Sequence, residues 1–497
     1  MSPPDRSSCW VASAVNSAKA TSRRRGPAGN LRAPAAGAGE DALGRTSSYR
    51  SGAMRRRWPP AVAGRLQRRC APVQPGPPAV HAEGRSERVA SAGRTADGGA
   101  EADVQHHEVV VVGGGNAGIS LAAKLLRDGV RGVAVVAPQP VHRYKPLLNY
   151  VAGGEAAMAD LERPMADVVP EGCTWIRDAV ESVDPAASTL RTRRGRELGF
   201  TTLVLCPGLV EDWAATPGLQ EAYAEGWAAS SYVPGSTPRT WSLLSAVRAG
   251  TVLFTVPPEP VSCGPTALKP LFLACEHWRR TGVLADVDVR LVLPAATATG
   301  VPNADEVIER ALARYGVQVL REARVEHVDA DLHDVAVVSP SGRHVLSDVV
   351  TGHVVPHYRA PRFIADSGLA ADPHPGLVDV DPFTLRHRRH PAVWGLGDAA
   401  DVRTRPSGGA LRKQVAVLSA NLAAARDGSA LQRYDGYTVV PITVGRHTLT
   451  LAEVDRDGAP SPSVPFTDPV EPRRLTWWFD RYALPQVYWR RILRGRV

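Results

Sequence analysis

The sequence predicts an α/β fold with two Rossmann-like domains and a C-terminal region that follows them. Short apolar strands alternate with amphipathic helices, which is the order of elements in a doubly wound parallel sheet. A glycine-rich turn joins the first strand to the first helix, as in dinucleotide-binding units. A second strand–helix series is inserted before the chain returns to complete the first domain.

The predicted elements follow one another in a regular order. The first unit contains strands Val109–Val112, Val133–Val136 and Leu203–Cys206 and helix Ile119–Arg127. The second contains strands Thr251–Val256 and Val289–Leu293 and helices Thr266–Arg280 and Ala304–Tyr315. The chain then returns through strand Ala392–Leu396 and helix Gly408–Ala425. We therefore assign residues 105–215 and 350–429 to one nucleotide-binding domain, 216–349 to a second Rossmann-like domain, and 430–497 to the C-terminal region.

Composition and charge exclude several classes of protein. The chain has 497 residues, 44% of them hydrophobic and 22% charged, and no apolar run that spans a membrane. The net charge of +9 comes from the N-terminus, because residues 1–80 hold 14 basic and three acidic residues. The remainder carries 45 basic and 47 acidic residues, so we exclude nucleic acid as a partner.

Residues 1–104 are rich in Ala, Arg, Ser, Gly and Pro and are predicted to be disordered. Two interpretations stay open. An arginine- and serine-rich start with few acids is typical of an organellar transit peptide. The alternative is that the segment is no part of the functional protein, because 54 arginines against five lysines indicate a high-GC coding sequence whose reading frame runs upstream of the true start.

Six cysteines are spread along the chain without any CxxC pair or metal-ligand spacing, so neither a zinc site nor a disulfide framework is predicted. They are Cys9, Cys70, Cys173, Cys206, Cys263 and Cys275. We interpret Cys173 and Cys206 as inert residues of apolar strands and Cys275 as a core residue of its helix.

The glycine loop is the most informative motif, because strand, G-x-G-x-x-G and helix occur in the order that dinucleotide binding requires. We assign to the cofactor the residues Gly113, Gly114, Gly115, Asn116, Ala117 and Gly118. The glycines allow a tight turn and a close approach of backbone N–H groups to a pyrophosphate, and the helix N-terminus favours its negative charge. One element is missing. The acid that normally ends the second strand and holds the adenosine ribose is replaced by Ala137, which predicts weakened binding.

Several further segments, taken in order, resemble the sulfide:quinone oxidoreductases, in the branch that includes the mitochondrial enzymes. They are Val141-His142-Arg143-Tyr144-Lys145-Pro146-Leu147, Pro260-Val261-Ser262-Cys263-Gly264-Pro265 followed by Lys269, Trp394-Gly395-Leu396-Gly397-Asp398, Tyr434-Asp435-Gly436-Tyr437, Leu451-Ala452-Glu453 and Tyr488-Trp489. The resemblance covers residues 108–497. It implies a disulfide-reductase-like fold, an FAD cofactor, and electron transfer from sulfide to a membrane quinone.

By position, the resemblance implies that Gly397 and Asp398 hold the ribityl chain of FAD, and that the helix opening at Gly408 points at the flavin ring. Gly208, which follows the Leu203–Cys206 strand, is assigned to the cofactor as well. Cys263 is the catalytic candidate. Because it lies just before a helix, we expect the helix dipole to lower its pKa and favour the thiolate.

The sequence departs from the family at the second redox cysteine, which should follow Gly397-Asp398 directly and is replaced by Ala399. Cys263 therefore cannot cycle a disulfide with a partner, and a persulfide on a single cysteine or another substrate stays open. The strand Thr251–Val256 is followed by prolines and no second glycine loop, which argues against NAD(P)H as the donor.

The C-terminal region is predicted to contact a membrane, because aromatic residues are mixed with arginines in it and Pro485 divides it into two short helices. These residues are Trp477, Trp478, Phe479, Tyr482, Leu484, Tyr488, Trp489, Ile492 and Leu493, with Arg473, Arg474, Arg490, Arg491 and Arg494. Packing on the protein's own core or on a homodimer partner is the alternative. The resulting location is peripheral to a membrane, on the cytoplasmic face of a bacterium or on the mitochondrial inner membrane if residues 1–104 are a transit peptide.

The sequence thus predicts an FAD-dependent oxidoreductase that passes electrons from sulfide or a related sulfur donor to a membrane quinone. Two alternatives remain. One is a type II NAD(P)H dehydrogenase, despite the missing second loop. The other is a flavin-binding relative without catalysis, which Ala137 and Ala399 favour.

Overall fold

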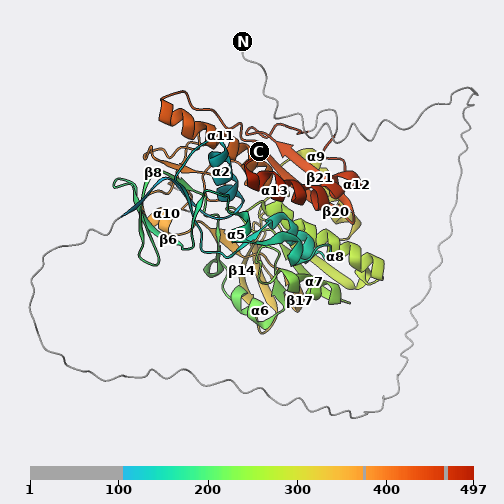
Figure 1. Ribbon diagram of the computed structural model, residues 1–497. Coiled ribbons are helices and arrows are strands. Elements are labelled where there is room, and N and C mark those ends of the chain that lie inside the picture. Colours follow the sequence, from blue (N-terminus) through green and yellow to red (C-terminus); the bar gives the residue numbers. More distant parts are fainter. Residues whose placement is uncertain (1–103, 373–375, 464–467, 497) are drawn as a thin grey trace, which may run out of the picture. The chain divides into compact units, whose positions relative to one another are not determined.

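The structure is a computed structural model that describes residues 104–372, 376–463 and 468–496. The predictions for the N-terminal segment lie outside these residues, apart from its last residue. Two sheets of mainly parallel strands, with helices packed on them, make up most of the described chain (Figure 1).

The larger sheet has seven strands, and the glycine loop lies at the carboxyl ends of its parallel strands. Its spatial order is β5 (Thr174–Ile176), β2 (Val133–Val136), β1 (Gln105–Val112), β8 (Glu197–Leu205), β7 (Thr189–Thr192) and β6 (Val180–Asp184), and β19 (Val393–Gly395) also pairs with β8. The first four strands and β19 run parallel, whereas β8, β7 and β6 are antiparallel neighbours. Val109–Val112 of β1 is buried as a continuous apolar run, as expected for a parallel strand covered on both faces.

The second sheet is wholly parallel, with the order β10 (Ala228–Ala229), β17 (Val349–His353), β11 (Gly250–Thr255), β12 (Val287–Val292) and β13 (Gln318–Leu320). An antiparallel sheet of β14 (Arg324–Asp329), β15 (Asp334–Ser339) and β16 (Gly342–Leu346) lies between β13 and β17 in the sequence. Three strand pairs complete the set: β3 (Val141–Arg143) with β4 (Glu162–Pro164), β9 (Val210–Asp212) with β18 (His357–Arg359), and β20 (Thr438–Gly445) with β21 (Thr448–Val454).

The longer helices carry the connections between strands. They are α2 (Asn116–Arg127), α6 (Leu219–Glu225), α7 (Thr237–Ala246), α8 (Leu268–Thr281), α9 (Pro302–Arg314) and α11 (Gly408–Asp427). Short helices are α3 (Leu148–Ala152), α4 (Met158–Leu161), α5 (Met165–Val168) and α10 (Phe363–Asp366). Helices α2 and α11 pack against each other, as Figure 1 shows, and so link the two separate parts of the chain that the sequence assigns to one domain.

Most predicted elements are present, and the differences have local causes. β2 occupies the predicted residues, and α11 begins at the predicted Gly408. The helix predicted from Thr266 begins as an α-helix only at Leu268, because Gly264–Ala267 form a 3₁₀ turn, η4. Cys173 precedes β5 and Cys206 directly follows β8, so the placement of both cysteines in strands is wrong, although Cys206 is buried. The domain boundaries at 216 and 350 stay predictions.

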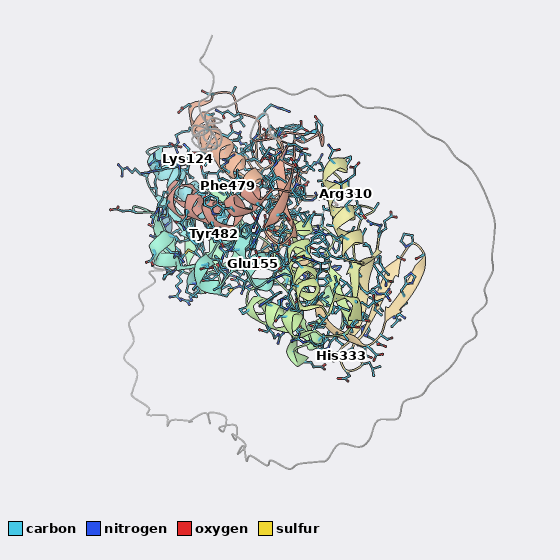
Figure 2. The ribbon with its side chains drawn as sticks, turned by 90° about the vertical axis from the view of Figure 1, so that its right-hand side faces the viewer. Lys124, Glu155, Arg310, His333, Phe479 and Tyr482 are labelled. Atoms are coloured by element: carbon cyan, nitrogen blue, oxygen red, sulfur yellow. The ribbon has the colours of Figure 1, made fainter. Side chains whose placement is uncertain are left out.

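The C-terminal region contains a hairpin that the sequence did not predict, β20–β21, followed by helical segments. These are α12 (Arg474–Trp478), the π-helical turn η6 (Phe479–Ala483), α13 (Leu484–Arg490) and the 3₁₀ turn η7 (Ile492–Arg494). α12, η6 and α13 follow one another without a break, so Pro485, in the first turn of α13, does not divide the region into two separate helices as predicted. The π-helical turn η6 directly precedes this proline, which lacks the N–H of a regular helix interior. Arg481 Nε donates to the Glu155 carbonyl at 2.9 Å, so these helices lie against the α3–α4 connection (Figure 2).

Buried side chains of this region belong to both main hydrophobic cores. Tyr434 and Tyr488 pack with the seven-stranded sheet, whereas Ile442 and Val444 pack with the five-stranded sheet. Among the described helices, none combines the length and the apolar composition needed to cross a bilayer.

Candidate active site

The glycine loop has the geometry of a dinucleotide cradle. A Cβ on Gly113, whose φ is +123°, would lie 2.2 Å from the Cys206 carbonyl oxygen, and one on Gly118 would lie 1.8 Å from the Gly113 carbonyl oxygen. These glycines let β1, β8 and α2 approach closely. A Cβ on Gly115 would meet nothing within 4 Å, so the open side of the loop is the side where a pyrophosphate fits.

The N-terminus of α2 is prepared for an anion. Gly115 is its N-cap and supplies no side-chain cap, and the first turn contains no acidic residue. The Asn116 side chain points along the helix toward its next turn, where it accepts a hydrogen bond from Ser120 Oγ at 3.0 Å. Ala117 is buried. The first backbone N–H groups of the helix therefore remain for a ligand, in the field of a 12-residue helix.

The register of the sheet brings the remaining predicted cofactor residues to the same edge. Val112 pairs with Leu205, and Leu205 pairs with Gly395, so the turns after β1, β8 and β19 are neighbours. Gly208, with φ +73°, faces open space. Gly397 N–H donates to Gln414 Oε1 of α11 at 2.9 Å, which fixes the turn that presents Asp398.

Asp398 and the start of α11 complete this edge. The half-buried Asp398 carboxylate accepts no hydrogen bond from any residue in the described ranges, which leaves it available to a ligand hydroxyl. A Cβ on Gly408 at the start of α11 would meet nothing within 4 Å. Open glycines, the uncapped N-terminus of α2 and an unpaired carboxylate along one sheet edge fit an extended flavin dinucleotide. The N-terminus of α11 is capped by Ser407, whose Oγ accepts from Ala410 N–H at 3.1 Å.

Ala137 follows β2 and is fully buried, with its N–H donating to the Ile176 carbonyl at 3.0 Å. The carboxylate expected there is therefore missing from the nucleotide site, as the sequence predicts.

Cys263 lies between β11 and η4 in a left-handed backbone conformation, with φ +50° and ψ +55°. Its carbonyl oxygen accepts hydrogen bonds from Tyr232 Oη at 2.9 Å and from Thr266 Oγ1 at 2.8 Å. These hydrogen bonds hold Cys263 in a backbone conformation that a non-glycine residue rarely adopts, as is common at functional sites. Its Sγ lies 4.0 Å from the Val439 carbonyl of β20, so the C-terminal hairpin borders the thiol.

The expectation of a lowered pKa for Cys263 is wrong. Burial raises the pKa of the thiol to about 12, and the nearby cations Arg405 and Lys269 offset only part of this effect. The carboxylates of Asp398 and Glu259 raise it further. The helix dipole does not overcome the loss of water, because burial favours the uncharged thiol.

The Asp398 carboxylate thus acts on the pKa of Cys263, although 134 intervening residues separate the two in the sequence. Glu259 and Arg405 act on this pKa too, and their side chains approach to 3.7 Å. Arg405 had no signal in the sequence other than its charge near the Gly397-Asp398 turn. Ala399 is fully buried, and the described cysteines Cys173, Cys206, Cys263 and Cys275 are all unpaired.

Two buried polar clusters that the sequence did not predict, one around Asp480 and one around His142, attach the C-terminal helices to this site. Lys269 Nζ on α8 donates to Asp480 Oδ2 at 2.7 Å, and Tyr150 Oη donates to the same oxygen at 2.7 Å. Asp480 is a lone acid in an arginine-rich segment, which is the signal that could have revealed the pair.

The second cluster, around His142, reaches the glycine loop. His142 is buried, and burial lowers its pKa to about 4, so the ring is neutral at pH 7. One nitrogen, Nδ1, lies 2.9 Å from the Gly114 carbonyl and donates to it, while Nε2 accepts from Tyr488 Oη at 2.5 Å. Tyr488 of α13 therefore positions the backbone of the glycine loop through His142.

Replacing Tyr488 with phenylalanine is expected to weaken flavin binding and to lower the free energy of unfolding by ~1–3 kcal/mol, because His142 Nε2 is left buried without a partner. Flavin release on dilution and urea denaturation measure the two effects. Tyr482→Phe is the control, since Tyr482 is 46% exposed. Equal flavin retention in both variants would contradict the positioning role of Tyr488.

A thiol with a raised pKa makes a second prediction. The alkylation rate of Cys263 by iodoacetamide is expected to rise about tenfold per pH unit from pH 7 to pH 9, because only the thiolate reacts and its fraction grows with pH below the pKa of about 12. Peptide mass spectrometry after timed quenching measures the rate for this cysteine alone. A plateau below pH 9 would show that the thiol is already ionised.

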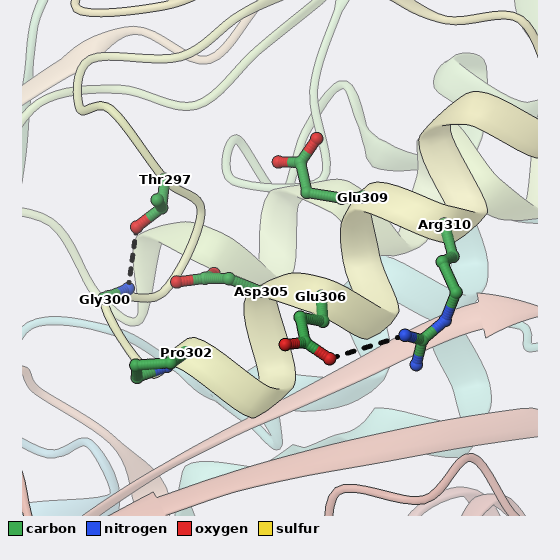
Figure 3. Close-up of a pocket in the computed structure, with 7 residues that line it drawn as sticks. All are labelled: Thr297, Gly300, Pro302, Asp305, Glu306, Glu309 and Arg310. Atoms are coloured by element: carbon green, nitrogen blue, oxygen red, sulfur yellow. Dashed lines mark hydrogen bonds and ion pairs between the residues drawn. The ribbon is translucent and has the colours of Figure 1, made fainter.

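A surface pocket of about 560 Å³ lies at the start of α9 (Figure 3). Its lining residues are Thr297, Gly300, Pro302, Asp305, Glu306, Glu309 and Arg310. Glu306 pairs with Arg310 at 3.5 Å, and Asp305 accepts from Thr299 N–H at 2.7 Å. Its charged groups are engaged locally and no nucleophile lines it, so we do not assign it to the reaction. No group of His, Cys, Asp and Glu in the described residues has the arrangement of a metal site.

Comparison with known proteins identifies the family. No protein-family model matches the sequence. The mitochondrial sulfide:quinone oxidoreductase of Dictyostelium discoideum is 30% identical over 394 residues, which cover 78% of this chain and 86% of that protein. The chain belongs to the sulfide:quinone oxidoreductase family. The mouse mitochondrial sulfide:quinone oxidoreductase is 29% identical over 396 residues, covering 78% of this chain and 87% of the mouse protein.

Solved structures agree on the fold. The sulfide:quinone oxidoreductase of Aquifex aeolicus superposes with a TM-score of 0.65 at 18% identity, covering 79% of this chain and 92% of that chain. A chain of the mitochondrial ATP synthase of Tetrahymena thermophila gives a TM-score of 0.68 at 20% identity, with 80% and 98% covered. The family, the α/β fold class and the assignment as a flavin-dependent oxidoreductase are thereby confirmed.

Proposed function

We propose that this protein oxidises sulfide, or a small sulfur donor of the same kind, at Cys263 and passes the electrons through FAD to a membrane quinone. The observation that carries the proposal is that β20 brings Cys263 to the start of α11: the Val439 carbonyl lies 4.0 Å from Cys263 Sγ, and Val439 N–H donates to Ser407 Oγ at 3.3 Å. FAD would supply the two-electron acceptor that sulfur oxidation needs. Gly113–Gly118, Gly208, Gly397 and Asp398 would hold it, with the start of α11 facing the ring.

The residues around Cys263 support sulfur chemistry on one cysteine. Oxidation of sulfide with the Cys263 thiol gives a persulfide and releases two electrons and two protons. A second sulfide ion then attacks the outer sulfur of the persulfide and breaks its bond to Cys263 Sγ. Cys263 is returned as a thiolate, and the two sulfide-derived sulfur atoms leave together as a disulfide dianion or its protonated form. Arg405 and Lys269 favour the anionic states of this sequence, because both lower the pKa of the thiol.

The C-terminal helices supply the acceptor side of the proposal. Leu475, Trp478 and Tyr482 are 63%, 52% and 46% exposed, at helical spacing across α12 and η6. Arg473 and Arg474 flank them and are exposed. An exposed apolar stripe with basic neighbours fits reversible contact with an anionic lipid surface, from which a quinone enters. Trp477 and Tyr488, by contrast, are buried in the protein's own core.

The proposed location is peripheral to a membrane. The relatives from mouse and Dictyostelium discoideum are mitochondrial proteins. The location is the mitochondrial inner membrane if residues 1–104 act as a transit peptide, and the cytoplasmic face of the membrane if the protein is bacterial. A homodimer stays the competing explanation for the exposed stripe.

Anaerobic titration of the full chain with sulfide and then with NADH tests the donor. Sulfide is expected to bleach the flavin absorbance, and a quinone analogue added afterwards is expected to restore it. Bleaching by NADH alone would support the type II dehydrogenase alternative, although prolines follow β11 where a second loop is needed. A bound flavin that neither donor bleaches would support the non-catalytic alternative that Ala399 favours.

A further inference from the structure

The adenosine end of the nucleotide site lies where β2 and β5 end, one and two strands beyond the glycine loop. Val112 at the end of β1 pairs with Val136, and Val136 pairs with Ile176 at the end of β5. This register places Ala137 beside Arg177 at the carboxyl edge of the sheet. In dinucleotide sites, the residue ending the second strand faces the adenosine ribose. A basic residue thus stands next to the position of the missing acid.

A pocket of about 550 Å³ opens at this place. We call it the arginine pocket, and its lining residues are Pro138, Arg177, Asp178, Ala179, Arg193 and Arg194. Its only acid is Asp178, which is buried and whose oxygens accept hydrogen bonds from Ala179 N–H at 2.8 Å and from Arg194 N–H at 3.3 Å. Because Asp178 is engaged by backbone groups, it does not replace the missing ribose carboxylate.

The hydrogen bonds of Asp178 also preorganise the pocket. Arg193 N–H donates to the Ala179 carbonyl at 2.8 Å, so the turn between β7 and β8 is fixed to the β5–β6 connection on both sides of Asp178. The side chains of Arg177, Arg193 and Arg194 are exposed, and none forms a salt bridge within 104–372, 376–463 and 468–496. Arg177 lies over the Trp175 ring at 5.9 Å, and the Trp175 indole donates to the Ala137 carbonyl at 3.0 Å.

We propose that the arginine pocket binds the adenosine ribose through guanidinium donors and accepts a phosphate on its 2′-hydroxyl. The proposal rests on the nucleotide loop of the proposed function and names the ligand class of that loop: adenine nucleotides, with those phosphorylated on the ribose bound more tightly. A carboxylate at the end of β2 accepts hydrogen bonds from ribose hydroxyls and repels a phosphate there. Removing it and supplying unpaired guanidinium groups reverses this preference, because guanidinium and phosphate pair bidentately.

Two probes that differ by a single phosphate test the proposal. Flavin-stripped full-length protein is titrated calorimetrically with AMP and with adenosine 2′,5′-bisphosphate, and FAD rebinding is followed by flavin fluorescence. The bisphosphate is expected to bind at least about tenfold more tightly than AMP, with a preference that declines as salt is added. The double variant Arg193→Ala/Arg194→Ala is expected to bind both probes equally.

The matched control is Arg191→Ala/Arg196→Ala, which removes the same charge from the same hairpin. Arg191 pairs with Glu181, and neither control residue lines the pocket. Loss of the preference in both double variants would overturn the assignment to this pocket, since it would reflect net charge. Equal binding of AMP and the bisphosphate by the unmodified protein, with FAD rebinding intact, would overturn the inference alone. Failure to bind FAD at all would overturn the proposed function as well.

Discussion

Cys263→Ser is expected to abolish bleaching of the flavin by sulfide, slowing it by roughly three orders of magnitude or more, while the purified protein keeps its flavin. A serine hydroxyl forms no persulfide, so the electrons of sulfide have no route through this residue. The residues proposed to hold the cofactor, Gly115 and Asp398 among them, are unchanged in this variant, so flavin occupancy should not change. Stopped-flow absorbance under anaerobic conditions measures the rate.

The control for this experiment is Cys173→Ser. Cys173 is a half-buried thiol that directly precedes β5, the strand followed by Arg177, and it does not lie at the proposed flavin edge. The flavin of the Cys173→Ser variant should bleach at the rate of the unmodified protein. A Cys263→Ser protein that bleaches as fast as this control would remove Cys263 from the reaction and leave direct attack of sulfide on the flavin. The flavin site itself would stand, because its geometry does not depend on the thiol.

Lys269→Met is expected to lower the free energy of unfolding by ~3–5 kcal/mol, because Asp480 is left buried with an uncompensated charge. Lys269 is 1% exposed and Asp480 6%, and the pair joins α8 to η6. The Tyr150 hydroxyl still donates to Asp480 but carries no charge. Urea denaturation at fixed pH measures the change, with the slope checked for unchanged cooperativity.

Removing both charges separates the pair from its packing. Lys269→Met/Asp480→Leu is expected to recover most of the lost stability, since apolar replacement of a buried ion pair is often neutral. The control is Arg343→Met, which breaks an ion pair with Glu326 at 57% and 43% exposure and should cost less than ~1 kcal/mol. A single Lys269→Met variant as stable as this control would show that water reaches Asp480 in solution.

The sequence was sufficient for features that depend on local order. The run Val109–Val112, the glycine loop and α2 follow one another directly, so their periodicity and spacing predict a nucleotide-binding unit without tertiary information. The loss of the ribose acid at Ala137 and of the second cysteine at Ala399 was equally readable. The hairpin β20–β21 was missed, because Pro441 interrupts the apolar run of β20 and a proline normally argues against a paired strand.

Tertiary structure decided the properties that depend on distant residues. The pKa of Cys263 follows from burial and from charges up to 142 positions away, and these overcome the helix dipole that the sequence indicates. Likewise, a row of arginines in a hairpin turn does not by itself predict a ligand. Only the register of β1, β2 and β5 relates it to the proposed adenosine end of the site. Local order thus determined the cofactor loop, while burial and strand register determined the chemistry around it, because electrostatics depends on distance through space and not along the chain.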